Sequence, residues 1–138
     1  MYVKKVIASF LIFGLCSSLF AEKPTHIKAI VTVDLKYDAA SFSKTLKKTG
    51  PKTPLVLENK KDALNYFTKK QLESIAKQIN FKTQKLAVIV WRGSSRDEIS
   101  YKVLESFPEQ IKFTYKHGRT KDLKLHLKLF ALRKNVKI

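Results

Sequence analysis

Cysteine is nearly absent from the 138-residue sequence, because it occurs only at Cys16. One cysteine cannot form an internal disulfide or a multi-thiolate zinc site, so the domain must fold on its hydrophobic core alone. Catalytic motifs are missing as well, since the sequence has no Gly-x-Ser-x-Gly nucleophile elbow. The histidines His26, His117 and His126 have spacings that match no metal-binding motif. We therefore predict neither a metal nor a cofactor.

The beginning of the chain has the pattern of a secretory signal peptide. Lys4 and Lys5 precede an apolar run at 6–20, and Ala21 stands at the expected cleavage position. The run is too short for a membrane span, which needs roughly 20 apolar residues. We predict a signal peptide at 1–21 and no membrane span after its cleavage.

The remaining residues, 22–138, show no linker or internal repeat and are expected to form a single domain. Cleavage of a signal peptide implies export, to the periplasm or the extracellular space. The alternative is a lipoprotein anchored through Cys16, although Leu15 occupies the position at which a lipobox needs a small residue.

Acidic residues are scarce: the chain has 11 against 28 basic residues, and its net charge is +17. Removal of 1–21 would leave 26 basic residues (28 − 2) and a charge of +15. Such a charge attracts anions, including lipid headgroups, envelope polymers and acidic proteins. Arginine is rare, however, and occurs only at Arg92, Arg96, Arg119 and Arg133. The lysine excess is equally expected from the composition of an A/T-rich genome, so both explanations stay open.

Short apolar segments, alternating or continuous, predict strands. The expected strands cover 27–36, 55–57, 85–91, 99–105, 110–116 and 123–132. The segment Leu86–Trp91 has no polar interruption, so we expect it to be buried on both faces in the centre of a sheet. The segments after it are joined by short polar breaks, which predicts an antiparallel β-meander.

A helix is predicted over residues 69–79. Thr68 and Gln71 fit a capping box, and four apolar residues recur on one helical face. These residues are Leu72, Ile75, Ala76 and Ile79. The predicted fold class is therefore α+β, with a mostly antiparallel meander sheet packed on one amphipathic helix.

The last two predicted strands suggest a lysine-rich face. If residues 117–123 connect them as a hairpin, Lys116 lies opposite Lys124, Thr114 opposite His126 and Lys112 opposite Lys128. The predicted anion or partner face therefore consists of Lys112, Lys116, Lys124, His126 and Lys128. The alternative is a solvated sheet face whose lysine stems cover apolar surface.

Two loops add candidate contacts. Tryptophan and arginine are enriched at interaction hot spots, and the candidate loop contacts are Trp91, Arg92, Arg96 and Arg119. In the second loop, His117 paired with Asp122 would suggest a hydrolase. No nucleophile is placed to complete such a site, so we favour a turn in which Gly118 supplies a positive φ and Asp122 accepts hydrogen bonds from backbone donors.

The C-terminal part of the chain resembles a set of small exported bacterial proteins that are common in planctomycetes and have no assigned activity. The resemblance lies in Ile79–Leu86, Trp91–Ser94 and Phe113–Leu123. The layout over residues 58–138 is also distantly similar to the C-terminal domain of PrcB-type protease-complex subunits. No functional residue is carried over, because the loop after Trp91 has one glycine where PrcB-type loops usually have several.

The sequence therefore predicts an exported, non-enzymatic binding or accessory module. Its partner, an envelope protein, would contact the lysine-rich face and the loops 92–97 and 117–122. The alternative is an electrostatic binder of an anionic envelope polymer, and a hydrolase using His117 is the less favoured third interpretation. Nucleic acid is not expected as a partner, because Tyr101, Phe113 and Tyr115 alternate onto the apolar face and leave no exposed stacking platform.

Overall fold

The computed structural model describes residues 28–37, 42, 45 and 48–138. The predicted signal peptide at 1–21, with Cys16, lies outside these residues, as does His26. The strands are β1 (Ile30–Val33), β2 (Leu55–Leu57), β3 (Gln84–Gly93), β4 (Glu98–Leu104), β5 (Gln110–Lys116) and β6 (Lys124–Arg133), and the helices are α2 (Lys60–Leu64) and α3 (Lys69–Ala76).

A four-stranded antiparallel sheet with the strand order β1-β6-β3-β2 forms the centre of the molecule. β3 and β6 pair along their full length, from Gln84 opposite Arg133 to Gly93 opposite Lys124. The side chains of Leu86–Trp91 are all buried. The prediction that this segment is a central strand buried on both faces is therefore confirmed.

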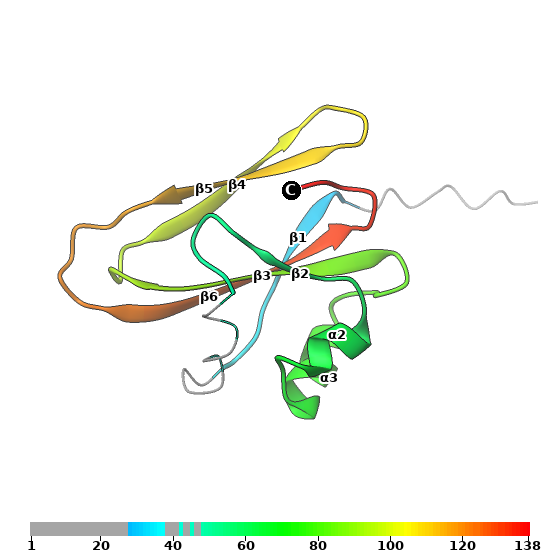
Figure 1. Cartoon of the computed structure of the whole chain (residues 1–138), viewed down its shortest axis with the longest axis horizontal. Helices are drawn as coiled ribbons and strands as arrows, with labels where there is room; N and C mark the ends of the chain where they lie inside the picture. The colour runs from blue at the N-terminus through cyan, green and yellow to red at the C-terminus, as the bar shows by residue number, and fades with distance from the viewer. Residues whose placement is uncertain (1–27, 38–41, 43–44, 46–47) are drawn as a thin grey trace, which may run out of the picture.

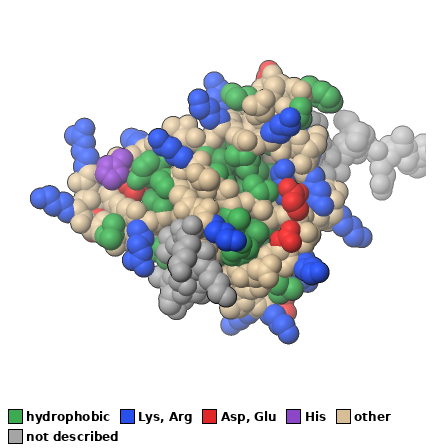
Figure 2. Space-filling model, viewed as in Figure 1, with side chains coloured by type: hydrophobic (Ala, Val, Ile, Leu, Met, Phe, Trp, Pro, Cys, Tyr) green, Lys and Arg blue, Asp and Glu red, His purple; other side chains and the backbone are tan. Residues whose placement is uncertain are grey.

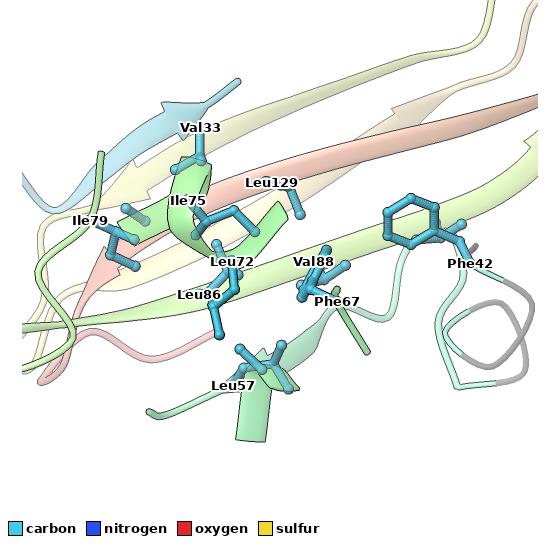
Figure 3. Packing of buried hydrophobic residues seen from close by; sticks show 13 residues of the cluster. Val33, Phe42, Leu57, Phe67, Leu72, Ile75, Ile79, Leu86, Val88 and Leu129 are labelled. Atoms are coloured by element: carbon cyan, nitrogen blue, oxygen red, sulfur yellow. The ribbon is translucent and has the colours of Figure 1, made fainter. Parts of the chain in front are cut away.

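The helices cover one face of this sheet (Figure 1). Thr68 and Gln71 form the predicted capping box, with Gln71 N donating to Thr68 Oγ1 at 3.3 Å and Thr68 N donating to Gln71 Oε1 at 2.9 Å. Leu72, Ile75 and Ile79 point from the helical layer into the core (Figure 3). They pack with residues of the sheet, including Val33, Leu57, Leu86, Val88 and Leu129.

The opposite face of the sheet is covered by a separate two-stranded sheet, the β4–β5 hairpin. Ile111 and Phe113 of β5 pack against the central sheet, and the rings of Phe113 and Phe130 lie 5.2 Å apart. The order of layers is therefore helices, central sheet and hairpin (Figure 1). The α+β class and the mostly antiparallel sheet packed on the amphipathic helix are confirmed.

The predicted pairing of the last two strands is wrong. β5 pairs with β4, and β6 lies between β1 and β3. The reason is burial: residues 129–132 of β6 are buried on both faces, which requires neighbouring strands on both sides and a layer above and below. The connection at 117–123 does not form a tight hairpin but carries the chain from the outer layer into the central sheet. Within the part of the chain that the structure describes, no helix is long and apolar enough to span a membrane.

Candidate functional site

Two loops lie against each other at one end of the molecule, where β3 and β5 end and β4 and β6 begin (Figure 1). Residues 94–97 connect β3 to β4, and residues 117–123 connect β5 to β6. Both loops are polar and rich in residues that hydrogen-bond to backbone groups, which explains why neither continues a strand. Together they form the region in which sequence analysis placed its candidate loop contacts.

Asp97 joins the two loops from the inside. Its side chain is fully buried. Oδ2 accepts hydrogen bonds from Trp91 Nε1 at 3.1 Å and from the Tyr115 hydroxyl at 2.7 Å, and Oδ1 accepts one from the Gly118 backbone N–H at 2.8 Å. Three donors from three segments thus converge on one carboxylate. Because a buried charge is tolerated only when it is fully hydrogen-bonded, this arrangement fixes the relative position of the segments.

The charge state of this centre follows from the same contacts. Burial alone would raise the pKa of Asp97, but the hydrogen bonds from Tyr115, Gly118 and Trp91, together with the nearby His117, hold it below the ordinary value of 3.8. The hydrogen bond to Asp97, with burial and the charge of the carboxylate, raises the pKa of Tyr115 to about 12. At neutral pH the pair is therefore a carboxylate that accepts a hydrogen bond from a neutral phenol.

His117 lies at the surface beside this carboxylate, with 73% of its side chain exposed. Its Nδ1 is 3.4 Å from Asp97 Oδ1 and 3.0 Å from the Tyr115 hydroxyl oxygen. The pairing of His117 with Asp122, considered from the sequence, is wrong, because Asp97 occupies that position. An imidazole backed by a carboxylate can act as a base, but the nearby Ser94 hydroxyl is buried and bonded to Thr120, not to His117.

A second set of hydrogen bonds links the loops on the other side of Asp97. Ser94 Oγ bonds to the Thr120 hydroxyl through a short contact, and it accepts from Thr120 N at 3.2 Å. Ser95 N donates to Asp122 Oδ1 at 3.2 Å, as expected for an aspartate that accepts from a backbone donor. Hydrogen bonds from the Thr120 and Ser95 side chains hold the pKa of Asp122 below its usual range. The loops are therefore cross-linked at several points.

Two glycines allow this close approach. A Cβ atom on Gly118 would lie 2.6 Å from the backbone carbon of Arg96 and from Ser94 Oγ, and one on Gly93 would overlap Asp97 Oδ2. The described glycines have no positive φ. The expectation that Gly118 serves a left-handed turn is therefore wrong: it is needed because the neighbouring backbone leaves no room for a side chain.

Trp91 and His126 are structural parts of this region. Trp91 is only 3% exposed, and its ring stacks on the imidazole of His126 at 4.6 Å and 8°. His126 is half-buried, with Nε2 2.8 Å from the Ser94 carbonyl oxygen. The candidate loop contact Trp91 is therefore buried at the end of the run Leu86–Trp91, and Tyr115 of the hairpin layer lies 6.3 Å from its ring. His126, predicted on the lysine-rich face, is instead stacked in this region and half-buried.

The five residues of the predicted lysine-rich face are divided between two layers. Lys112 and Lys116 are on β5, and Lys116 Nζ is 3.7 Å from Glu98 Oε2. Lys124, His126 and Lys128 are on β6 of the central sheet, and Lys124 Nζ is 3.8 Å from Asp122 Oδ2. The expected pairs across one hairpin are absent from these strands. Instead, Lys112 lies opposite Lys102 of β4.

Three of the four arginines lie at the end formed by the two loops, where Lys116, Lys121 and Lys124 also lie. Arg92, Arg96 and Arg119 are all exposed at the end formed by the two loops. The backbone of Gly118 lies close to that of Arg96, and Arg119 is the next residue after Gly118. Arg92 precedes Gly93 at the end of β3. In Figure 2, Lys and Arg side chains and an imidazole lie at this end, and further Lys and Arg side chains lie around the rest of the outline. The fourth arginine, Arg133, is bonded to Glu109 and Asn135 in another part of the molecule. We call the surface of Arg92, Arg96 and Arg119 the arginine end.

Cavities also occur elsewhere among the described residues. One of about 770 Å³ lies beside α3 and is lined by Asp34, Leu35, Lys36, Thr68, Lys70, Gln71 and Ser74. A smaller one lies under the C-terminus, against β5. Neither includes a residue of the two loops, so the arginine end is not built around either cavity. Among the residues with described positions, no group of His, Cys, Asp and Glu is arranged to hold a metal ion.

Comparison of the chain with protein-family models, with curated proteins and with solved structures gave no match. The resemblance to exported planctomycete proteins and to PrcB-type domains therefore stays a prediction. The arginines and both loops were predicted from the sequence, whereas Asp97 and Tyr115, which hold the loops together, were not. The only local signal for Asp97 was its place in a polar loop, because its three donors come from 6, 18 and 21 positions away.

Proposed function

We propose that the protein is an exported, non-enzymatic binding module that recognises an anionic partner through the arginine end. The observation that carries this proposal is the position of Arg92, Arg96 and Arg119. They are three of only four arginines among 28 basic residues; Arg96 and Arg119 lie on the two cross-linked loops, and Arg92 lies at the end of β3 that leads into one of them. Compositional bias spreads lysine over the whole surface and gives no reason for arginine to gather at one end.

Arginine suits this role for a physical reason. Its planar guanidinium can bind a carboxylate, phosphate or sulfate through two parallel hydrogen bonds, whereas lysine attracts anions as a point charge. A rigid support lowers the entropy that is lost when these side chains bind. The buried Asp97 carboxylate supplies such a support, and the carboxylate of Asp122 is already engaged by Ser95 and Lys124.

The proposal predicts that positive charge without the guanidinium geometry of arginine will bind a polyanion more weakly. Changing Arg92, Arg96 and Arg119 together to lysine keeps the net charge but removes the bidentate geometry. We expect the affinity for an immobilised polyanion to fall about tenfold, the equivalent of roughly one lost hydrogen bond. The measurement is a binding titration on polyglutamate and on sulfated dextran, which separates carboxylate from sulfate recognition.

A matched control removes the same charge elsewhere. Lys60, Lys69 and Lys77 are exposed on the helical layer, and their change to alanine subtracts three charges. We expect this variant to bind more tightly than the one in which the three arginines become alanine. Equal losses in both variants, with no effect of the arginine-to-lysine change, would show diffuse electrostatic attraction and contradict the proposal. Binding should also weaken as salt is added.

Export predicts a defined mature N-terminus. The native protein recovered from its source should begin at Glu22, which intact mass spectrometry would show directly. Recovery of a chain that still carries residues 1–21 would contradict cleavage. A lipid-modified chain that begins at Cys16 would instead support the lipoprotein alternative.

A further inference from the structure

The β4 strand has an open edge. It pairs with β5 on one side, and on its other side no strand lies within the described parts of the chain. The edges of the central sheet are short, because β1 has four residues and β2 has three. The far side of β5 is bridged at its start by Lys137, which exchanges backbone hydrogen bonds of 2.8 and 2.9 Å with Ile111 and Glu109, so among the described strands β4 has the longest edge without a bridge. Long open edges are sites at which another strand can add.

The side chains of this edge are partly apolar. Tyr101 and Val103 face the central sheet, yet they are 41% and 36% exposed. The ring of Tyr101 lies 5.7 Å from that of Phe130, at the border of the second core. Phe107, in the tip that follows β4, is fully exposed. An added strand would extend the hairpin layer and cover this border.

The outer face of β4 carries charges in an unfavourable arrangement. Lys102 lies directly opposite Lys112 of β5, and such like-charged cross-strand pairs are destabilising. Glu98, near the other end of β4, lies opposite Lys116. The edge therefore has an uncompensated positive charge at Lys102. Glu98, four positions away, is an exposed carboxylate that Lys116 contacts at 3.7 Å and that has room for a second lysine.

We propose that the occupant of this edge is a second copy of the chain, paired antiparallel through β4 and related by a twofold axis at Ser100. In this register Glu98 of each copy lies opposite Lys102 of the other, and Ile99 lies opposite Tyr101. Two opposite-charge pairs and two apolar pairs result. The two hairpins become one four-stranded layer.

Charge selects this register among those that keep the faces together. A twofold axis at Tyr101 places Lys102 against Ser100, and an axis at Lys102 places the two lysines against each other. Only the axis at Ser100 gives each lysine an acidic neighbour. The same self-complementarity favours a second copy over an unrelated strand.

The overall charge of +17 per copy opposes association at low salt. At physiological salt, where the Debye length is about 8 Å, this repulsion is largely screened while contacts within the pair persist.

The test is a charge exchange followed by sedimentation velocity at physiological salt. The unchanged chain should show a concentration-dependent dimer. Glu98→Lys and Lys102→Glu should each weaken it about tenfold, because each change places like charges opposite each other at two symmetric positions. The double variant, which restores opposite charges, should recover the dimer. Lys77→Glu, at an exposed position on the helical layer away from the edge, is the control for the change in net charge and should leave the dimer in place.

Each other outcome overturns the proposal. A monomer at all concentrations would show that the edge does not self-associate, and a dimer that Lys102→Glu leaves intact would use a different surface. A double variant that stays monomeric would reject the register. Misfolding does not confuse the result, because Lys102→Glu removes a repulsion with Lys112 inside its own hairpin and circular dichroism monitors the fold. The outcome is also independent of the arginine end, which binding to polyanions tests separately.

Discussion

Replacing Asp97 with asparagine should lower the midpoint of thermal unfolding by about 8 °C or more. The carboxylate accepts hydrogen bonds from Trp91, Tyr115 and Gly118. An asparagine has one acceptor oxygen, and its amide group would meet at least one of these donors with a donor of its own. Buried donors without acceptors are costly. Thermal unfolding followed by circular dichroism measures the effect.

The acid dependence gives the same prediction a second readout. Because the pKa of Asp97 is held below its ordinary value of 3.8 in the folded protein, the unfolded chain binds its proton first as the pH falls. The stabilisation by Asp97 is complete above the ordinary value and is lost as the pH falls through the lowered value. The unchanged protein should therefore lose stability below about pH 4 more steeply than the Asp97→Asn variant. The Asp97→Asn variant should still lose some stability as the pH falls, since the pKa of Asp122 is lowered in the folded protein as well.

Glu73→Gln provides the matched control. Glu73 is exposed on α3, so this change removes one negative charge without disturbing a buried contact. We expect its thermal midpoint and its acid dependence to stay close to those of the unchanged protein. If Asp97→Asn behaved in the same way as Glu73→Gln, Asp97 would not be the residue that holds the loops.

Sequence periodicity was sufficient to predict the six strands and the helix α3, but not the short helix α2. The alternation in residues 99–105 and 110–116, the continuous run at 86–91 and the capping box before α3 all correspond to observed elements. These features are local, because each depends on residues within one strand or one turn. The choice of strand partner is not local. A connection of seven residues is compatible both with a hairpin and with a passage to another layer, and only the double-sided burial of 129–132 distinguishes them.

The candidate site was also predicted only in part: its exposed arginines were named from the sequence, but the burial of its aromatic residues was not. Arg92, Arg96 and Arg119 were named from the sequence because arginine is enriched at interaction hot spots and these three lie in or beside the two loops. Trp91 was expected both at the end of a buried strand and as a loop contact, and His126 was placed on the lysine-rich face by strand alternation, but the two rings stack on each other under the hairpin layer. Their burial follows from the position of β5 above the central sheet. A sequence without a known strand order cannot indicate that position.

Replacing Gly118 with alanine should destabilise the protein by about 2 kcal/mol, the usual cost of adding volume where there is no space. The new Cβ would meet the backbone carbon and the Cβ of Arg96, at 2.6 and 2.8 Å. Neither atom can move without shifting the loop that Asp97 and Ser94 hold in place. Chemical denaturation would measure the loss of free energy of unfolding.

Gly50→Ala is the natural comparison, because a Cβ at Gly50 would have no atom within 4 Å. Its φ is not positive, so an alanine can adopt the same backbone conformation. This change should be neutral or stabilise the protein by a few tenths of a kcal/mol through the unfolded chain. If the two alanine variants had equal stability, the close contact of the loops would not constrain the fold.

The same substitution links stability to the proposed function. A shift of the backbone at Gly118 moves Arg119 relative to Arg96, although both side chains and the net charge are unchanged. We therefore expect Gly118→Ala, at a temperature where it remains folded, to weaken polyanion binding, whereas Gly50→Ala should bind as the unchanged protein does. Diffuse attraction depends on total charge and would be insensitive to this shift. Normal binding by a folded Gly118→Ala variant would therefore show that the arginine end does not require the geometry that the buried carboxylate maintains.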